Sequence, residues 1–453
     1  MEDFASIFKA YDVRGLFPQQ INTEVARSIG ESWARLIKRN EPETKTVIVG
    51  RDMRPSGQEL VLAFSQGVNA QDVDVIDIGL CSTDMLYFAS GHLQLPGSVF
   101  TASHNPSGYN GIKFCFSSAK PISFDTGLKE IRDEVLTEMP NGNGNGGVSH
   151  LNLLEDFAKH VQSFIDKEKL RPLRVVVDTA NGMGGMVVPA AFQNLPFELE
   201  ILYEDLDGTF PNHPADPIQP ENLVDLQRRV LETEADIGLA FDGDADRVFL
   251  VDEKAQPVSG SVTTALVAKK VLREEPGAAI VHNLICSQIV PETITKLGGK
   301  PVRTRVGHSF IKKIMAEEQA AFGGEHSGHY YFRDNFRADS GLIAALIVLE
   351  ELSCATKPLS ELLAPFNSYI SSGEININVS DSSKVIEEVS KKYSDSDQDN
   401  LDGLTVRFDK CWFNLRPSNT EPLLRLNLEA EDEVTYEKTL QEVQELIESN
   451  KEL

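Results

Sequence analysis

Three aspartates alternate along the segment DIGLAFDGDADRVFLVDE, at positions Asp242, Asp244 and Asp246. Carboxylates placed this close repel one another, and each raises the pKa values of its neighbours. A hard divalent cation removes that penalty and prefers oxygen ligands. A solvated acidic turn is the alternative, but the strand-like runs IGLAF and VFLVD on either side argue against it. The pattern therefore predicts a Mg²⁺ site with open coordination positions, where phosphate oxygens commonly bind.

A serine opens a second candidate site, in the segment SVFTASHNPSGYNGIKFCF. Two apolar runs flank a turn-rich insert that begins with Ser103 and His104, and Lys113 follows the turn. A plain hairpin would need only a pair such as Asn110-Gly111. The additional residues favour a loop that presents Ser103, whose hydroxyl is a candidate nucleophile.

A phosphate group could be held by the segment RPSNTEPLLRL, which begins at Arg416. The planar guanidinium fork of Arg416 matches the geometry of a phosphate. Ser418, Asn419 and Thr420 add three short hydrogen-bonding side chains on a proline-bounded loop. An ordinary polar turn fits the segment equally well, so the segment alone leaves both interpretations open.

Sugar hydroxyls are the groups that the segment GGEHSGHYYF could bind, through Glu325 and Ser327. A metal site of Glu325, His326 and His329 is the rival interpretation, but the spacing matches no known zinc pattern. A further histidine, His308, stands at a helix start in RVGHSFIKKIM. A capping or core role is the usual one for a lone histidine in that position.

The elements that must position these residues follow a repeated order. Residues 46–64, 174–192 and 278–298 each run from a β-branched stretch through a turn into a helical pattern. Strand, loop and helix repeated at wide spacing predict α/β domains with largely parallel sheets. In such sheets, chemistry collects in the loops at the carboxyl ends of the strands.

We expect four domains, which span residues 1–150, 151–256, 257–368 and 369–453. The NGNGNGG tract at residues 141–147 is typical of a loop near the end of the first domain. Residues 361–380 have the pattern of a helix end followed by an alternating strand, where a smaller fourth domain begins. That domain ends in a charged amphipathic helix over residues 431–453.

The bulk composition restricts the possible partners. With 69 acidic and 43 basic residues, the formal charge of −26 disfavours nucleic acids and anionic membranes. A small anionic substrate would need a local cluster of cations. Five scattered cysteines without a CxxC pair predict reduced thiols and a cytoplasmic protein. We expect no signal peptide and no membrane span, because the longest apolar stretch, near residues 341–352, is too short.

Together these motifs resemble those of the α-D-phosphohexomutase family. The matching segments are YDVRG, GRDMRPSG, TASHNPSGYNGIK, DGDADR, GEHSGH and RPSNTEP, in the family's order from Tyr11 to Pro422. The resemblance covers nearly the whole chain. It implies a four-domain α/β architecture around a central cleft, with three similar α/β domains that have mixed sheets and a smaller α+β C-terminal domain.

The resemblance also implies a role for each candidate residue. Ser103 carries a phosphoryl group, and Mg²⁺ is held by a phosphoserine oxygen together with Asp242, Asp244 and Asp246. The sugar is contacted by Glu325, Ser327 and His329. The phosphate that does not react is held by Arg416, Ser418, Asn419 and Thr420. Near the phosphoserine lie Arg14, Lys113 and Arg247.

The sugar hydroxyl that accepts the phosphoryl group must lose a proton. Lys113 is one candidate to take it, because burial and neighbouring cations can lower a lysine pKa toward neutrality. His308 is the competing acid or base, and the sequence leaves the choice open. Within the serine loop, we expect His104, Asn105 and Pro106 to hold the turn rigid.

The implied reaction interconverts hexose 1-phosphates and 6-phosphates through a hexose 1,6-bisphosphate, in a monomer or dimer. GEHSGH and the residues after it are most similar to bacterial phosphomannomutases, which predicts mannose phosphates as substrates. Dual mannose and glucose activity stays open, and so does glucosamine activity, because phosphoglucosamine mutases typically carry GEQSGH. Two alternatives come from other classes: a Mg²⁺-dependent sugar-phosphate phosphatase and a non-catalytic sugar-phosphate sensor.

Overall fold

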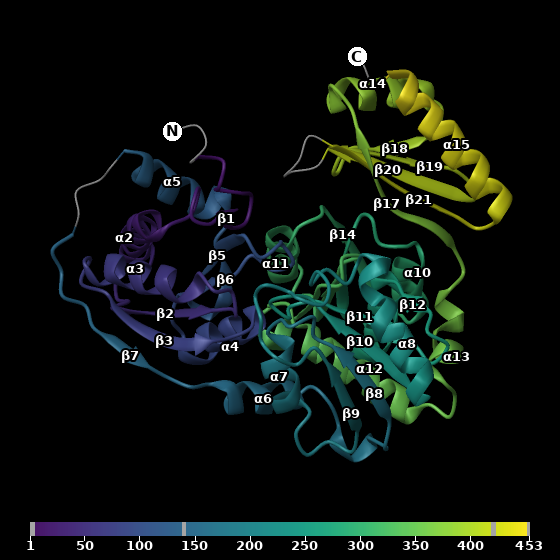
Figure 1. The fold of residues 1–453 in the computed structure, drawn as a ribbon. Coiled ribbons are helices and arrows are strands. Elements are labelled where there is room, and N and C mark those ends of the chain that lie inside the picture. Colours follow the sequence, from purple (N-terminus) through teal and green to yellow (C-terminus); the bar gives the residue numbers. More distant parts are fainter. Residues whose placement is uncertain (1–4, 138–141, 418–422, 451–453) are drawn as a thin grey trace.

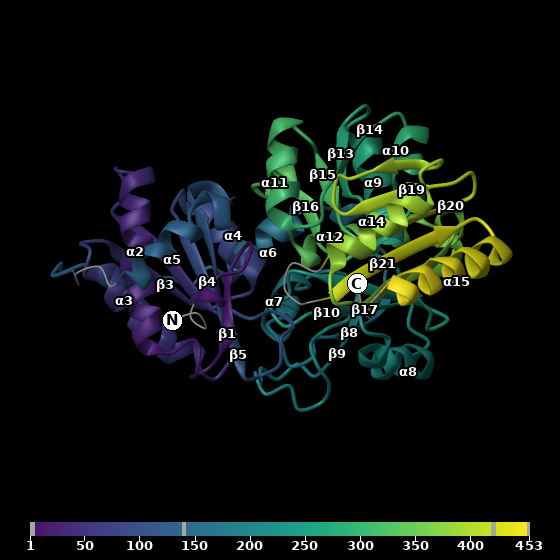
Figure 2. The ribbon, with the colours of Figure 1, turned by 90° about the horizontal axis from the view of Figure 1, so that it is seen from above.

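The computed structural model describes residues 5–137, 142–417 and 423–450. Four β-sheets follow one another along the chain, and each is accompanied by its own helices. In Figure 1 the first sheet lies on one side of the molecule, the second and third lie together on the other, and the fourth lies above them. Figure 2 shows the fourth domain from above, over the third.

The first sheet contains seven strands in the order β1-β5-β4-β2-β3-β7, with β6 beside β5. The strands are β1 Val13–Leu16, β2 Thr46–Arg51, β3 Asp74–Leu80, β4 Gly97–Phe100, β5 Tyr109–Phe116, β6 Lys120–Pro121 and β7 Val148–His150. The helices are α2 Thr23–Asn40, α3 Gly57–Asn69, α4 Thr83–Leu93 and α5 Leu128–Leu136. Strands β2, β3, β4 and β7 pair in parallel, whereas β5 is antiparallel to its three neighbours.

The second and third sheets repeat this mixture of parallel and antiparallel pairs. The second, in the order β12-β11-β10-β8-β9, contains β8 Arg174–Asp178, β9 Glu198–Leu202, β10 Ile237–Phe241, β11 Val248–Asp252 and β12 Pro257–Val258. Its helices are α6 Leu154–Gln162, α7 Gly184–Ala191 and α8 Val224–Thr233. Strand β12 lies just past residue 256, the expected end of the second domain, and still pairs with β11.

The third sheet has the order β14-β13-β15-β16 and contains β13 Ala279–Asn283, β14 Lys300–Thr304, β15 Phe322–Gly324 and β16 Tyr330–Phe332. Its helices are α9 Gly260–Glu274, α10 Ile289–Lys296, α11 His308–Glu317, α12 Gly341–Cys354 and α13 Leu359–Leu363. The fourth sheet is wholly antiparallel, in the order β17-β21-β20-β19-β18. It contains β17 Ile370–Asn378, β18 Asp397–Asp399, β19 Leu404–Arg407, β20 Cys411–Pro417 and β21 Leu423–Ala430, with α14 Ser382–Lys392 and α15 Glu433–Asn450.

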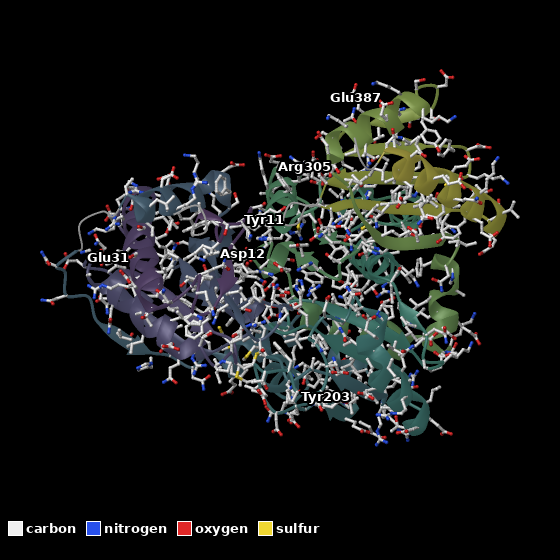
Figure 3. All side chains as sticks on the ribbon, turned by 45° about the horizontal axis from the view of Figure 1, so that its top comes forward. Tyr11, Asp12, Glu31, Tyr203, Arg305 and Glu387 are labelled. Atoms are coloured by element: carbon white, nitrogen blue, oxygen red, sulfur yellow. The ribbon has the colours of Figure 1, made fainter. Side chains whose placement is uncertain are left out.

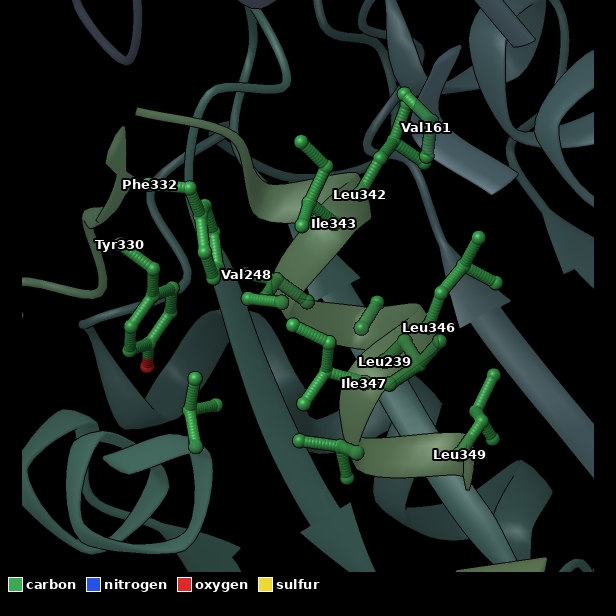
Figure 4. Packing of buried hydrophobic residues seen from close by; sticks show 14 of the residues in the cluster. Val161, Leu239, Val248, Tyr330, Phe332, Leu342, Ile343, Leu346, Ile347 and Leu349 are labelled. Carbon is green, nitrogen blue, oxygen red and sulfur yellow. The ribbon is translucent and has the colours of Figure 1, made fainter. Parts of the chain in front are cut away.

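These sheets confirm the predicted fold class of three α/β domains with mixed sheets and a C-terminal domain. The apolar stretch at residues 341–352 forms most of α12, which is buried on nearly every side. A helix that is apolar all round belongs in a protein core. Leu342, Ile343 and Leu346 of α12 pack against Leu239 and other core residues of the second domain (Figure 4). Among the described residues, no helix combines the length and apolar character needed to cross a bilayer.

One feature of the topology brings the candidate site residues together. In each of the first three sheets, a strand that pairs in parallel is followed along the chain by an antiparallel neighbour: β4 by β5, β10 by β11 and β15 by β16. The loop that connects the two strands has the same position in each domain. These loops run over residues 101–108, 242–247 and 325–329. They carry Ser103, the three aspartates and the GEHSGH motif, respectively.

Candidate active site

The serine loop places its hydroxyl against the second domain. The Ser103 Oγ donates a hydrogen bond to Oδ2 of Asp242 at 2.8 Å, and both residues are buried. The backbone of Ser103 has a φ of 48°, a left-handed conformation that is uncommon for a residue with a side chain. Nδ1 of His104 lies 3.3 Å from the same Oγ. The structure therefore holds the candidate nucleophile between a carboxylate and an imidazole.

The three aspartates form a compact group of oxygen ligands, as predicted. One carboxylate oxygen of each lies within 4.8 Å of the others, and all three residues are buried. Within the part of the chain that the structure describes, Oδ1 of Asp244 and Oδ1 of Asp246 have no hydrogen-bond partner. Buried carboxylate oxygens without partners are costly, and a hard dication would satisfy them. The residues present therefore fit Mg²⁺.

Two cations contact this group of carboxylates. Lys113 Nζ lies 2.8 Å from Oδ2 of Asp244 and 2.7 Å from Oδ2 of Asp246. Arg247 Nε donates to Oδ2 of Asp242 at 2.9 Å. A third, Arg14, reaches the serine loop through Nη1, which donates to Oδ1 of Asn105 at 2.6 Å. These cations supply the local positive charge that the acidic chain would need for an anionic substrate.

The protonation of Lys113 differs from the sequence-based expectation. Burial acts to lower its pKa, but the carboxylates of Asp244 and Asp246 outweigh burial and raise that pKa well above its ordinary value. The expected shift toward neutrality was wrong for this arrangement, because the neighbours that dominate are anions. Lys113 is therefore a charged ammonium here and stands in the place where a dication would compete for the same oxygens.

The sugar-loop candidates lie directly beside the aspartates. Glu325 is buried and accepts hydrogen bonds from the Tyr331 hydroxyl at 2.7 Å and from the Gly307 amide at 3.2 Å. The Ser327 Oγ and the Nδ1 of His329 are 2.9 Å apart. The Nε2 of His329 is 3.8 Å from Oδ1 of Asp246. The third domain thus reaches the group formed by the first two.

His308 occupies a different environment, at the start of α11. Its ring lies 4.8 Å from the ring of Tyr11, between centroids, and its buried Nδ1 has no partner among the described residues. Burial, followed by the nearby charge of Lys312, lowers the pKa of His308 well below its ordinary value. Tyr11 of the first domain also donates weakly to the Val306 carbonyl, at 3.4 Å. Figure 3 shows Tyr11 beside the third domain, where the two domains meet.

Sequence reasoning missed a buried ion pair close to His308. Lys312 lies 2.8 Å from Oδ1 of Asp339, and both side chains are almost fully buried. The Lys312 Nζ also lies 3.8 Å from the centroid of the Tyr87 ring, which belongs to the first domain. A lysine on an amphipathic helix resembles any surface residue in sequence, so no local signal distinguished it. Its position joins the first and third domains beside the site.

The candidate phosphate loop belongs to the fourth domain. Nη2 of Arg416 lies 2.5 Å from Oε2 of Glu374, and Nη1 of Arg425 lies 3.2 Å from Oε1 of the same carboxylate. Arg416 and Arg425 face each other across strands β20 and β21. Glu374 therefore holds two guanidinium groups on one face of the sheet. Ser418, Asn419 and Thr420 lie outside the described residues.

Comparison with known proteins matches every domain to one family. The models for phosphoglucomutase/phosphomannomutase α/β/α domains I, II and III match residues 5–141, 154–256 and 259–369, and the C-terminal domain model matches residues 374–446. A protein of Xanthomonas campestris named "Phosphohexose mutases" is 39% identical, over 97% of this chain and 98% of that protein. A Vibrio cholerae "Phosphomannomutase" is 38% identical, over 94% of this chain and 95% of that protein.

A crystal structure of a phosphoglucomutase/phosphomannomutase family protein from Burkholderia thailandensis superposes with a TM-score of 0.90 and 32% identity, over 98% of this chain and 97% of that one. This chain therefore belongs to the α-D-phosphohexomutase family. It is a phosphohexomutase, an isomerase that transfers a phosphoryl group within its substrate.

Proposed function

We propose that this phosphohexomutase interconverts mannose 1-phosphate and mannose 6-phosphate through a phosphoserine at Ser103 and a hexose 1,6-bisphosphate. The observation that carries the proposal is the contact of the Ser103 hydroxyl with Asp242, inside the group of three aspartates. A hydroxyl held against a cluster of oxygen ligands is well placed to carry a phosphoryl group that shares their cation.

A cation held by the aspartates, together with the nearby basic side chains, would neutralise the negative charge of the phosphoryl group. Asp242, Asp244 and Asp246 would hold Mg²⁺, which when bound supplies a Lewis acid for phosphoryl oxygens. Arg247 is anchored by Asp242, so its guanidinium can offset phosphate charge without a large rearrangement. Phosphoryl transfer depends mainly on such positioning and charge neutralisation.

The cycle contains two transfers, and each must move one proton. In the first, the P–O bond to Ser103 breaks while a sugar hydroxyl oxygen bonds to phosphorus and gives up its proton. In the second, the bond between the other sugar oxygen and its phosphorus breaks while the Ser103 oxygen bonds to that phosphorus; the Ser103 hydroxyl gives up its proton and the released sugar oxygen takes one up. We propose Lys113, whose ammonium lies against Asp244 and Asp246, as the donor of the proton to the leaving oxygen. His308 remains the competing candidate, although its Nδ1 is buried.

Glu325, Ser327 and His329 are proposed to bind the sugar, and Arg416 with Ser418, Asn419 and Thr420 to bind the phosphate that does not react. Arg416 is held in place by Glu374, which supports a fixed phosphate-binding guanidinium. The two proposed sites belong to different domains, so movement of the fourth domain would bring them together around the substrate. Exclusion of water by such closure would protect the phosphoserine from hydrolysis.

Mannose phosphates are the proposed substrates because the sugar loop and the names of the similar proteins agree. The test is a side-by-side measurement of kcat/KM for mannose, glucose and glucosamine 1-phosphates. We expect the highest value for mannose 1-phosphate and a measurable value for glucose 1-phosphate. A tenfold preference for glucosamine 1-phosphate would overturn the substrate assignment. Free phosphate released in place of hexose 6-phosphate would instead support the phosphatase alternative.

A cytoplasmic location is part of the proposal. The five cysteines are all free thiols, and four of them are buried. Free thiols persist in reducing compartments. Whether the protein is a monomer or a dimer stays a prediction, and light scattering of the purified protein would decide it.

A further inference from the structure

A single arginine contacts the backbone of the serine loop at three carbonyl groups and that of the next strand at a fourth. Arg54, in the turn after β2, is almost completely buried. Its Nη2 donates to the carbonyl oxygens of Ser103 at 2.8 Å and Asn105 at 2.7 Å. Its Nη1 donates to the carbonyl oxygens of Pro106 at 2.9 Å and Tyr109 at 3.0 Å. One guanidinium group therefore ties three residues of the loop that carries the candidate nucleophile to the start of β5.

Arg54 is itself held on its remaining edge and on one face. Its Nε donates to Oδ2 of Asp52 at 3.2 Å, and its backbone amide donates to Oδ1 of the same carboxylate at 2.9 Å. The ring of Phe210, from the second domain, lies 5.2 Å from the guanidinium carbon. A side chain that is fixed in this way can act as a rigid template for the loop above it.

The backbone of Ser103 needs such a template. Its φ of 48° is costly for any residue with a Cβ and persists only where the surroundings enforce it. The amide of Ser103 donates to Oγ1 of Thr101 at 2.9 Å, while its carbonyl accepts from Arg54. On the other side, a Cβ at Gly243 would lie only 2.5 Å from the Ser103 carbonyl oxygen. The carbonyl is therefore confined between Arg54 and the aspartate loop.

We propose that Arg54 is a positioning residue for phosphoryl transfer, which holds the Ser103 backbone so that Oγ stays beside Asp242. This inference rests on the proposed role of Ser103 as the phosphoryl carrier. Lysine could not replace Arg54, because it has a single nitrogen and lacks the planar fork that reaches four carbonyl groups at once. Neither the sugar nor either phosphate needs to touch Arg54 for it to act.

The experiment compares Arg54→Lys with wild type and with Arg51→Lys. Arg51 lies in the same motif, but the hydrogen bond that its side chain makes goes to the Asp52 carbonyl. We expect Arg54→Lys to lower kcat and the rate of Ser103 phosphorylation about 100-fold, because small displacements of reacting groups have effects of that size. KM should stay within about twofold, since no substrate contact is removed. Arg51→Lys should behave as wild type.

Hydrogen exchange supplies a readout that does not depend on turnover. The amides of residues 103–105 and 107–109 should exchange faster in Arg54→Lys, while those of α3 remain protected. If Arg54→Lys does not fold, Asp52→Asn offers a milder change that leaves the carbonyl contacts in place, and we expect the same effects at about tenfold. Exchange and kcat equal to wild type in the folded variants would overturn the inference.

The same data separate this inference from the proposed function. A wild-type protein whose Ser103 never takes up a phosphoryl group would contradict the proposed role of Ser103. The exchange comparison would still show whether Arg54 holds the loop. A wild type that forms phosphoserine, beside an Arg54→Lys variant of unchanged kcat, would contradict only the role of Arg54.

Discussion

Ser103 and Asp242 meet across the boundary between the first and second domains, where the serine Oγ donates to Oδ2 of the aspartate at 2.8 Å. The contact joins residues 139 positions apart in the chain. The contact therefore holds the Ser103 hydroxyl against Asp242, one of the three aspartates of the proposed metal site.

Phosphorylation should therefore map to Ser103. Treatment with a hexose 1,6-bisphosphate should add one phosphoryl group to the intact protein, and peptide mass spectrometry should locate it on Ser103. Ser103→Ala should remain unmodified and lose nearly all turnover, because the carrier oxygen is gone. An unmodified wild-type spectrum after this treatment would argue against the phosphoserine cycle.

His104 should prove to be a support for the loop and not a base. Its Nδ1 lies near the Ser103 Oγ, but burial, followed by Arg247 and Arg14, lowers its pKa well below the ordinary value. We expect His104→Ala to reduce kcat less than tenfold, a loss too small for a missing base. Abolished turnover in a folded variant that still forms phosphoserine would place this histidine in the chemistry.

Asp244→Asn should remove the dependence of activity on Mg²⁺ together with most of the turnover. The substitution removes one anionic ligand and also one partner of Lys113. We expect kcat to fall at least about 100-fold, measured across a Mg²⁺ titration, with calorimetric Mg²⁺ binding weakened in parallel. Asp205→Asn, at an exposed position of the same domain, is the matched control. Unchanged Mg²⁺ affinity in Asp244→Asn would exclude this residue as a ligand.

Arg416→Ala should mainly raise KM, because a clamp on the unreactive phosphate acts equally in the ground and transition states. Loss of a charged hydrogen-bonding group predicts an increase of about 10- to 100-fold. Arg407→Ala is the control, since Arg407 is also ion-paired on this sheet but its partners are Asp397 and Asp399. A collapse of kcat at constant KM would show that Arg416 acts at the reacting phosphate instead.

The third domain should lose stability in acid because of His282. Burial lowers the pKa of His282 to about 4, and its Nδ1 lies 3.1 Å from the Asn283 carbonyl oxygen. The unfolded chain takes up this proton near pH 6.5, so the contribution to stability is complete above that pH and is lost as the pH falls toward 4. The loss amounts to about 3 kcal/mol at most.

The thermal midpoint measures this effect. Between pH 7.5 and pH 5, the wild-type midpoint should fall further than that of His282→Gln, which carries no titrating group at this position. His150→Gln, which changes an exposed histidine, should follow the wild type. Parallel pH profiles for wild type and His282→Gln would contradict the prediction.

Much of the site could be predicted from sequence because its candidate residues lie close together in short segments of the chain. The spacing of Asp242, Asp244 and Asp246 predicted a cation site through the mutual repulsion of neighbouring carboxylates, and the structure brings the three carboxylates together. The insert around Ser103 exceeded what a hairpin requires. The α/β class followed from repeated strand, loop and helix patterns, which depend on local periodicity, whereas the mixed character of the sheets was implied only by the family resemblance. Each of these signals lies within about twenty residues of chain, which a single sequence displays directly.

The sequence by itself thus determined the contents of each loop, and the tertiary structure decided which loops meet. The loops after β4, β10 and β15 occupy equivalent places in three sheets, so packing of the domains places Ser103 on Asp242 and His329 beside Asp246. Packing also set the charge of Lys113 by pairing it with Asp244, 131 residues away. Arg54 resembles a surface arginine in sequence, yet it is buried and donates a hydrogen bond to the Ser103 carbonyl oxygen. Such contacts depend on chain segments brought together only by folding, and no local pattern encodes them.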